Sequence, residues 1–275
     1  LLPPLKGHNL DVMYENIDRL LEFNPGYINI TFHQPETMYI KNADGTTGKV
    51  VVRKRPGTVA ISAAIQYKYN IPVVPHIICG GHTKEDIENI LIDLNFLGIN
   101  NVLALRGDGP KPDKIFIPEQ YGHAHTTELV EQIMHMNQGK YLDDKLQNPT
   151  PTDFSIGVAG YPEKHFEAPD MEVDMKYLKM KVDNGAEYIV TQMFFDNKYF
   201  FDFVLSKGPN KNIYIVISAN SFEMVRDERC ICATTLTEKT FKTYGNFERY
   251  IMKMRSKKDK YIESYNSKNK PKEDT

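Results

Sequence analysis

The sequence predicts an α/β protein built around a parallel sheet, and three observations support this fold class. Short apolar runs alternate along the chain with amphipathic segments of about 10–15 residues, which is the pattern of βαβ units. The length of 275 residues fits a single α/β barrel. Hydrophobic residues make up 41% of the chain, so a sizeable core can form, and disorder is excluded as the main state.

Helices are predicted where apolar side chains recur at helical spacing. Proline or glycine marks several helix ends: Pro25 follows the first helix, Gly98 the third and Gly185 the fifth. Thr83 and Asp86 have the spacing of a capping box at the start of the third helix. In chain order, the predicted helices cover residues 12–23, 58–69, 84–97, 127–137, 174–184 and 198–205.

Strands are predicted where short apolar runs are bounded by turn-forming residues. The opening segment Leu1-Leu2-Pro3-Pro4 reads as the end of a strand, because proline cannot continue a central strand. Segments 38–40 and 49–53 flank a turn-rich stretch and are expected to pair as a hairpin arm. The remaining predicted strands are 27–32, 72–78, 101–105, 154–159, 188–192 and 213–217. A barrel built from these would have a truncated strand one, and its strand eight is not evident.

The C-terminal part of the chain differs in character. From Ser218 onward the alternation of apolar runs with amphipathic segments becomes weaker. Residues 251–275 carry eight Lys or Arg against four Asp or Glu. We therefore expect one barrel domain over 1–250 and a basic, flexible tail over 251–275. The chain starts without Met, and we expect the natural polypeptide to begin earlier.

Charge and cysteine content narrow the range of partners and compartments. The 34 basic residues nearly balance the 36 acidic ones, which gives no electrostatic reason to expect nucleic acid or an anionic membrane as partner. No apolar run approaches the ~20 residues of a membrane span. Three cysteines argue against a disulfide framework, so a cytoplasmic location is expected.

Polar and titratable residues follow the apolar runs at the ends of several predicted strands. Functional residues of a parallel βα barrel lie at the carboxyl ends of its strands, so these side chains are expected to share a polar pocket. Each also has a purely structural interpretation: His76 as a core histidine, Asp108 as a loop cap and Gln192 as a hydrogen-bonding group at the sheet end. The residues are Thr31, His33, His76, Arg106, Gly107, Asp108, Tyr161, Glu163, His165 and Gln192.

One motif suggests a metal. His123-Ala124-His125 has the His-x-His spacing of barrel metallohydrolases. It follows a Pro-rich stretch in a predicted loop instead of lying on a strand, which makes a metal site the less favoured interpretation. A metal-dependent hydrolase would combine these histidines with His76, Asp108 or His165.

Three blocks then carry a family resemblance: Arg106-Gly107-Asp108, Tyr161-Pro162-Glu163-Lys164-His165 and Thr191-Gln192-Met193-Phe194-Phe195-Asp196. In this order and spacing, over about residues 1–205, the sequence resembles the methylenetetrahydrofolate reductase family. The resemblance implies a (β/α)8 TIM barrel that binds FAD, which takes hydride from NADH or NADPH and reduces 5,10-methylenetetrahydrofolate to 5-methyltetrahydrofolate. It also implies a role in methionine biosynthesis and self-association into a homo-oligomer.

The resemblance assigns roles residue by residue. Asp108, beside the flavin, would favour a cationic folate intermediate and is expected to be catalytic. Gln192 is the second expected catalytic residue and would bind both folate and nicotinamide. Lys181 would complement the charge of the pyrophosphate. The expected cofactor-binding residues are Thr31, His76, Arg106, Gly107, Asp108, His125, Ala159, Tyr161, His165, Asp174 and Lys181.

Departures from the family pattern define the alternatives. The catalytic glutamate of the family opens a Glu-x-x-Pro-Pro motif and would stand immediately before Leu1. Tyr177 and Met180 stand where some relatives carry Asn and Arg toward the cofactor phosphates. The main alternative is therefore a non-catalytic flavin-binding or interaction protein on a decayed barrel, and the metal-dependent hydrolase is the third hypothesis.

Overall fold

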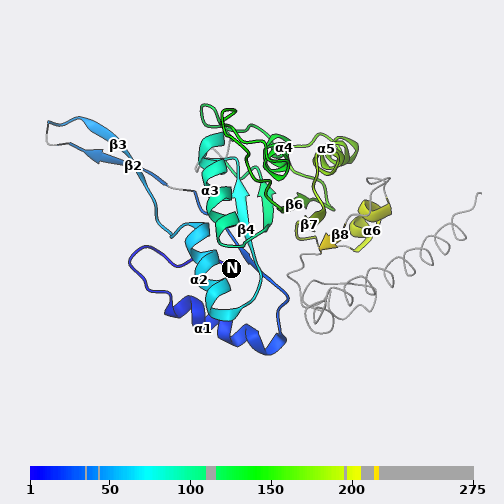
Figure 1. The fold of residues 1–275 in the computed structure, drawn as a ribbon, viewed down its shortest axis with the longest axis horizontal. Coiled ribbons are helices and arrows are strands. Elements are labelled where there is room, and N and C mark those ends of the chain that lie inside the picture. Colours follow the sequence, from blue (N-terminus) through cyan, green and yellow to red (C-terminus); the bar gives the residue numbers. More distant parts are fainter. Residues whose placement is uncertain (35, 43, 110–115, 195–196, 206–213, 217–275) are drawn as a thin grey trace, which may run out of the picture.

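The computed structural model describes residues 1–34, 36–42, 44–109, 116–194, 197–205 and 214–216. Helices alternate with strands and pack against the outside of a curled sheet (Figure 1). The helices are α1 (Asp11–Leu20), the 3-10 helix η1 (Leu21–Phe23), α2 (Thr58–Tyr69), α3 (Lys84–Phe96), α4 (Thr126–Asn137), α5 (Met171–Asp183) and α6 (Asn197–Leu205). The strands are β1 (Ile28–Ile30), β2 (Glu36–Lys41), β3 (Thr47–Val52), β4 (Val73–Ile78), β5 (Asn101–Leu105), β6 (Ser155–Gly160), β7 (Tyr188–Thr191) and β8 (Tyr214–Val216).

The main sheet has six strands in the order β1-β4-β5-β6-β7-β8, and every neighbouring pair is parallel. This confirms the predicted mixed α/β fold with a parallel sheet. The described strands curl into part of a barrel wall and do not close it. The prediction that strand eight is not evident concerns residues after 217, and these lie outside the described part of the chain, as does the predicted tail over 251–275.

The backbone of Leu1 extends the sheet beyond β1. Its nitrogen donates to the carbonyl of Asn29 at 2.6 Å, and its carbonyl accepts from the N–H of Thr31 at 3.1 Å. Two hydrogen bonds that flank Ile30 in this way are the pattern of a parallel bridge. The pairing agrees with the prediction that the opening segment ends a strand.

Local chemistry explains where the helices begin. Thr83 and Asp86 form the predicted capping box at α3: the Asp86 N–H donates to Thr83 Oγ1 at 3.1 Å, and the Asp86 carboxylate accepts from the Thr83 N–H at 2.8 Å. Asp170 caps α5 by accepting from the Val173 N–H at 2.8 Å. This cap starts α5 at Met171, earlier than the residue 174 predicted from apolar spacing alone.

The two faces of the main sheet have different roles. The helix-facing side contributes a continuous apolar row to the core: Ile30, Ile77, Val102, Ala104, Ile156, Val158 and Ile189. The strand register places His76, Leu103, Gly157 and Tyr188 side by side on the opposite face. His76 thus lies on the face that the helices do not cover, which is the inner face of the curled sheet.

Strands β2 and β3 form the predicted hairpin arm and pair only with each other in the described structure. The arm leaves the carboxyl end of β1 and projects away from the rest of the fold (Figure 1). Its apolar side chains Met38, Ile40 and Val50 are 44%, 46% and 41% exposed.

No helix among the described residues is long and apolar enough to cross a membrane.

Candidate functional site

The carboxyl ends of the parallel strands bring most of the predicted site residues to one edge of the sheet. Thr31 follows β1, His76 lies near the end of β4, and Arg106 follows β5. Tyr161 follows β6, and Gln192 follows β7. Parallel strands have their carboxyl ends at the same edge, and this edge is where βα folds carry their sites.

Arg106 is the centre of a network that joins the ends of β5 and β6. Its Nη2 donates to Glu167 Oε1 at 2.6 Å, and its guanidinium lies 5.0 Å from the centre of the Phe116 ring. The Glu167 carboxylate raises the pKa of Arg106, and Arg106 lowers the pKa of Glu167. Both groups therefore stay charged at neutral pH.

His165 is tied to the same network through its backbone and its ring. Its Nδ1 accepts from the Glu167 N–H at 3.2 Å, and its own N–H donates to Asp174 Oδ2 at 2.8 Å. The ring lies edge-on to Tyr161, with 4.6 Å between the ring centres, and stacks on Phe166 at 4.7 Å. Burial lowers the pKa of His165, which favours a neutral imidazole.

Lys181 lies on α5, the helix that follows β6, and adds a cation to this group of residues. Its Nζ lies 3.3 Å from the carbonyl of Ala159. Burial lowers the pKa of the Lys181 ammonium, and the nearby carboxylate of Asp174 opposes that shift. The structure therefore brings Arg106, His165, Asp174 and Lys181 together in a charged, partly buried cluster.

Asp108 lies in the loop that follows β5, at the carboxyl edge of the sheet, and its side chain is exposed. The Gln34 side chain donates to the Asp108 carbonyl at 3.3 Å, which ties the stem of the hairpin arm to the β5 end. Gly107 has φ of +84°, and a Cβ there would lie 3.3 Å from Ile78 Cδ1. Glycine is needed at this turn because an L side chain would strain the backbone and crowd its neighbours.

A second group of polar residues lies at the ends of β1 and β4. Thr31 Oγ1 donates to the Leu1 carbonyl at 2.9 Å and lies 3.4 Å from His33 Nε2. Burial, and then the charge of Arg55, lowers the pKa of His33. Burial also lowers the pKa of His76 to about 4, so His76 is neutral at physiological pH.

Gln192 and His125 stand apart from the charged cluster. The Gln192 side chain is exposed, and its Oε1 accepts from the Met193 N–H at 3.1 Å. His125 is exposed at the start of α4, where its backbone N–H donates to Glu128 Oε2 at 3.3 Å. The cofactor-binding role of His125 stays a prediction from the resemblance.

The His-x-His motif does not present two ligands to one point. His123 is buried, and its Nε2 lies 2.5 Å from Gln132 Oε1, whereas His125 is exposed. The Nδ1 of His123 lies 3.7 Å from the Glu128 carboxylate. Within the described ranges, no group of three or more His, Cys, Asp or Glu side chains is arranged to hold a metal ion.

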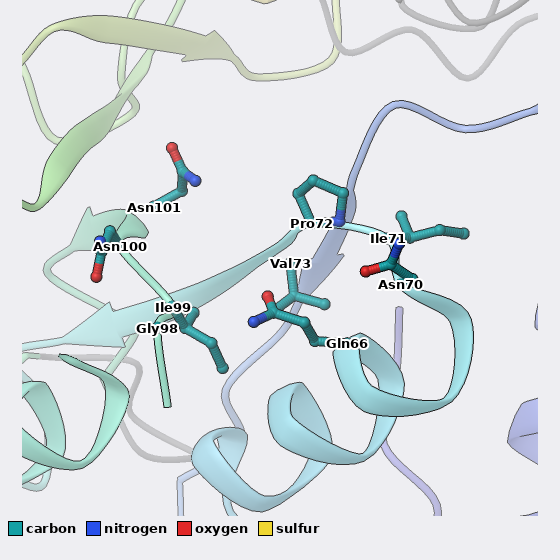
Figure 2. Close-up of a pocket in the computed structure, with 9 residues that line it drawn as sticks. All are labelled: Gln66, Asn70, Ile71, Pro72, Val73, Gly98, Ile99, Asn100 and Asn101. Carbon is teal, nitrogen blue, oxygen red and sulfur yellow. The ribbon is translucent and has the colours of Figure 1, made fainter. Parts of the chain in front are cut away.

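A hollow of about 300 Å³ lies at the opposite edge of the sheet. Figure 2 shows its lining, which comes from the end of α2 and from the segments that lead into β4 and β5, including Gln66, Asn70 and Asn101. This is the amino-terminal edge of the strands, which in barrels of this kind serves stability and not chemistry. We therefore place the candidate site at the carboxyl edge.

Sequence reasoning missed three residues at the site. Glu167 pairs with Arg106, Gln34 bonds the Asp108 backbone, and Asn29 carries a buried Oδ1 without a hydrogen-bond partner among the described residues. The parity of β1 identifies Asn29 as inward-facing, because its neighbours Ile28 and Ile30 belong to the helix-facing core. No local signal identifies Glu167 or Gln34, since their partners lie 61 and 74 positions away in the chain.

Comparisons with known proteins identify a family. A sequence profile described as methylenetetrahydrofolate reductase matches residues 1–223. The chain is 33% identical over 211 residues to methylenetetrahydrofolate reductase (NADH) 1 of Arabidopsis thaliana, which covers 74% of this chain and 31% of the relative. It is 31% identical over 217 residues to methylenetetrahydrofolate reductase 1 of Schizosaccharomyces pombe, which covers 77% of this chain and 31% of the relative.

A bacterial relative is shorter. The chain is 29% identical over 194 residues to 5,10-methylenetetrahydrofolate reductase of Escherichia coli, which covers 70% of this chain and 53% of the relative. The chain thus spans about a third of the length of the plant and yeast relatives and about half of the bacterial one. The match over residues 1–223 includes every strand of the described sheet and both sides of the charged cluster. The chain therefore belongs to the methylenetetrahydrofolate reductase family.

Proposed function

We propose that this chain is the catalytic barrel of a flavin-dependent oxidoreductase that reduces 5,10-methylenetetrahydrofolate to 5-methyltetrahydrofolate with NADH or NADPH. The names of the relatives support the reaction and the nicotinamide co-substrate, since they specify both NADH and NADPH enzymes. The observation that carries the proposal is the cluster of Arg106, His165 and Lys181 at the carboxyl edge of β5 and β6. It provides the donors that an anionic cofactor needs.

The donor chemistry fits FAD. Lys181 is a buried ammonium whose nearby carboxylate, Asp174, opposes but does not cancel the effect of burial on its pKa. A bound diphosphate would supply the missing negative charge, and Arg106 would add a planar guanidinium that suits phosphate oxygens. The rings of Tyr161 and His165 offer adjoining aromatic surface. When bound, the flavin would carry hydride from nicotinamide to folate.

The exposed polar residues would act on the substrates. The Asp108 carboxylate would stabilise positive charge on the folate as its ring opens, because a carboxylate attracts a nearby cation. The exposed amide of Gln192 would hold folate or nicotinamide through hydrogen bonds, since an amide both donates and accepts. Thr31 and His76 would complete the site from β1 and β4, with His76 as a neutral hydrogen-bonding group.

The proposal extends to the whole protein. It includes a (β/α)8-type barrel over residues 1–250 with a truncated strand one, a separate tail over 251–275, a cytoplasmic location, self-association and a part in methionine biosynthesis. The family and the low cysteine content support these statements. Small molecules are the expected partners, and the balanced charge argues against nucleic acid and membranes.

The experiment is a visible absorption spectrum of the purified protein, recorded before and after anaerobic addition of NADH or NADPH. We expect a flavin band that bleaches with the nicotinamide and returns on addition of 5,10-methylenetetrahydrofolate. A protein that takes up no FAD would overturn the flavin assignment. A flavin that bleaches but is not reoxidised by folate would overturn the folate reaction and favour a non-catalytic or different oxidoreductase role.

Asp108→Asn tests the catalytic assignment in the same assay. Loss of the carboxylate should slow reoxidation by folate on the order of 100-fold, while the flavin still binds. Asp153→Asn is the matched control, because Asp153 is an exposed aspartate outside the site. Equal folate rates in the two variants would contradict a catalytic role for Asp108.

A further inference from the structure

Glu167 is a site residue whose presence neither the sequence motifs nor the assigned cofactor contacts explain. Its carboxylate accepts from Arg106 Nη2 at 2.6 Å, and its backbone N–H donates to His165 Nδ1 at 3.2 Å. One residue therefore contacts two groups that the proposed function assigns to cofactor binding, on two different strand ends. A carboxylate in this place is unexpected, because it would repel the phosphates of an incoming cofactor.

The contacts of Arg106 show what the carboxylate does there. The guanidinium lies 5.0 Å from the Phe116 ring centre on one side and meets Glu167 at its edge. The side chains of Arg106 and Glu167 are 25% and 38% exposed, so solvent weakens the pair, and its main effect is geometric. The bond to Glu167 uses only Nη2 of the guanidinium. The other N–H groups of Arg106 can therefore point toward a ligand.

The contact with His165 fixes a tautomer. Nδ1 accepts from the Glu167 N–H, so it carries no proton, and in the neutral ring Nε2 is then the donor. Burial keeps the ring neutral by lowering its pKa. The backbone of Glu167 therefore determines which nitrogen of His165 can donate to a ligand.

Hydrogen bonds hold the loop around Glu167 in one conformation. The Ala168 N–H donates to the His165 carbonyl at 3.1 Å, and Lys164 Nζ donates to the same carbonyl at 2.9 Å. The His165 N–H is held by Asp174 at 2.8 Å. The first two bonds close the loop on itself and the third ties it to α5, and together they restrict the movement of Glu167 away from Arg106.

We propose that Glu167 is a positioning residue, whose side chain sets the orientation of the Arg106 guanidinium and whose backbone N–H sets the Nε2–H tautomer of His165. Both donors are then preset for the anionic part of a cofactor. The inference rests on the proposed function, because that function assigns Arg106 and His165 to cofactor binding. Presetting lowers the entropy that binding must overcome.

The test compares the FAD affinity of wild type, Glu167→Gln, Arg106→Gln and the double variant, measured by titrating cofactor-free protein and following flavin fluorescence. Glu167→Gln should weaken FAD binding about 5- to 10-fold, although it removes a repulsive charge. In the Arg106→Gln background, the same change should alter affinity less than about twofold, because a positioning residue acts through its partner. Glu131→Gln, an exposed glutamate on α4, is the matched control and should bind like wild type.

Two results would overturn the proposal. Tighter FAD binding by Glu167→Gln would mean that the carboxylate competes with the cofactor instead of preparing its site. An equal loss in both backgrounds would mean that Glu167 acts independently of Arg106, as a purely structural residue would. Thermal unfolding of each variant identifies a general loss of folding.

A readout without cofactor separates this inference from the proposed function. In ¹⁵N spectra of the protein, the imidazole of His165 should show a protonated Nε2 and an unprotonated Nδ1 at neutral pH. The Arg106 guanidinium should show restricted rotation that Glu167→Gln removes and Glu131→Gln does not. The opposite tautomer, or a freely rotating Arg106 in wild type, would refute the positioning role. If wild type shows these signals but takes up no FAD, the proposed function fails and the positioning geometry stands.

Discussion

At the scale of single residues, the fold shifts the pKa of His76 far below that of a free histidine. It lies on the inner face of β4, beside Leu103 in the strand register. Burial lowers its pKa from about 6.5 to about 4. The unfolded chain therefore binds more protons than the folded chain between these two pH values, and stability rises with pH across that window.

This difference predicts an acid sensitivity. As pH falls from 6.5 to 4, His76 should cost the fold roughly 3 kcal/mol, since one pKa unit corresponds to about 1.4 kcal/mol. His76→Gln should flatten the fall in unfolding free energy over this window, as measured by chemical denaturation at a series of pH values. His8→Gln, at an exposed histidine, should leave the slope unchanged. Identical slopes for wild type and His76→Gln would contradict the burial argument.

Single residues were predictable from the sequence where their effect is local. Thr83 and Asp86 lie three positions apart, so their capping box follows from spacing and hydrogen-bond reach. The polar residues after the strands were found because a change from apolar to polar marks a strand end. Glu167 and Gln34 were not found, because each acts on a partner more than 60 positions away in the chain.

At the scale of elements, the pairing of β6 with β7 depends on the lack of a side chain at Gly157. Gly157 is the register partner of Tyr188. A Cβ on Gly157 would lie 2.2 Å from the Tyr188 ring, which is far inside van der Waals contact. The ring is held in place because the Tyr188 hydroxyl donates to the Val102 carbonyl at 2.9 Å, across to β5.

Gly157→Ala should therefore lower the unfolding free energy by about 1–3 kcal/mol, because the half-buried ring of Tyr188 must shift to admit the methyl group. Denaturant unfolding monitored by circular dichroism measures this loss. In a Tyr188→Ala background the methyl group has room, so the same change should cost less than about 1 kcal/mol. A cost that is equal in both backgrounds would show that the tyrosine ring is not the obstacle.

The type and order of the elements followed from the sequence because periodicity reports burial directly. Each predicted strand over 27–32, 72–78, 101–105, 154–159, 188–192 and 213–217 overlaps a strand of the main sheet. The boundaries were less predictable. The start of α5 was placed at 174 from apolar spacing, whereas the Asp170 cap moves it to Met171. Parallel pairing itself followed only indirectly, from the helices between the strands.

At the scale of the whole molecule, stability is expected to be uneven. Strands β4, β5 and β6 have neighbours on both edges and bury Ile77, Ala104 and Val158 against the helices. The hairpin arm has one pair of strands, and its apolar face is exposed. An isolated two-stranded hairpin is only marginally stable in water, so the arm should open without unfolding the main sheet.

Hydrogen exchange tests this division, and its result also bears on assembly. In the free protein, amides of β2 and β3 should exchange at least about 100-fold faster than those of β5, because local opening requires far less free energy than global unfolding. Mass spectrometry of exchanged peptides at several protein concentrations measures both regions, with α3 as an internal reference for a packed helix. Slow exchange in the arm at every concentration would contradict the exposed hairpin. Protection that grows with concentration would mean that a second copy covers Met38, Ile40 and Val50, because only association depends on concentration in this way.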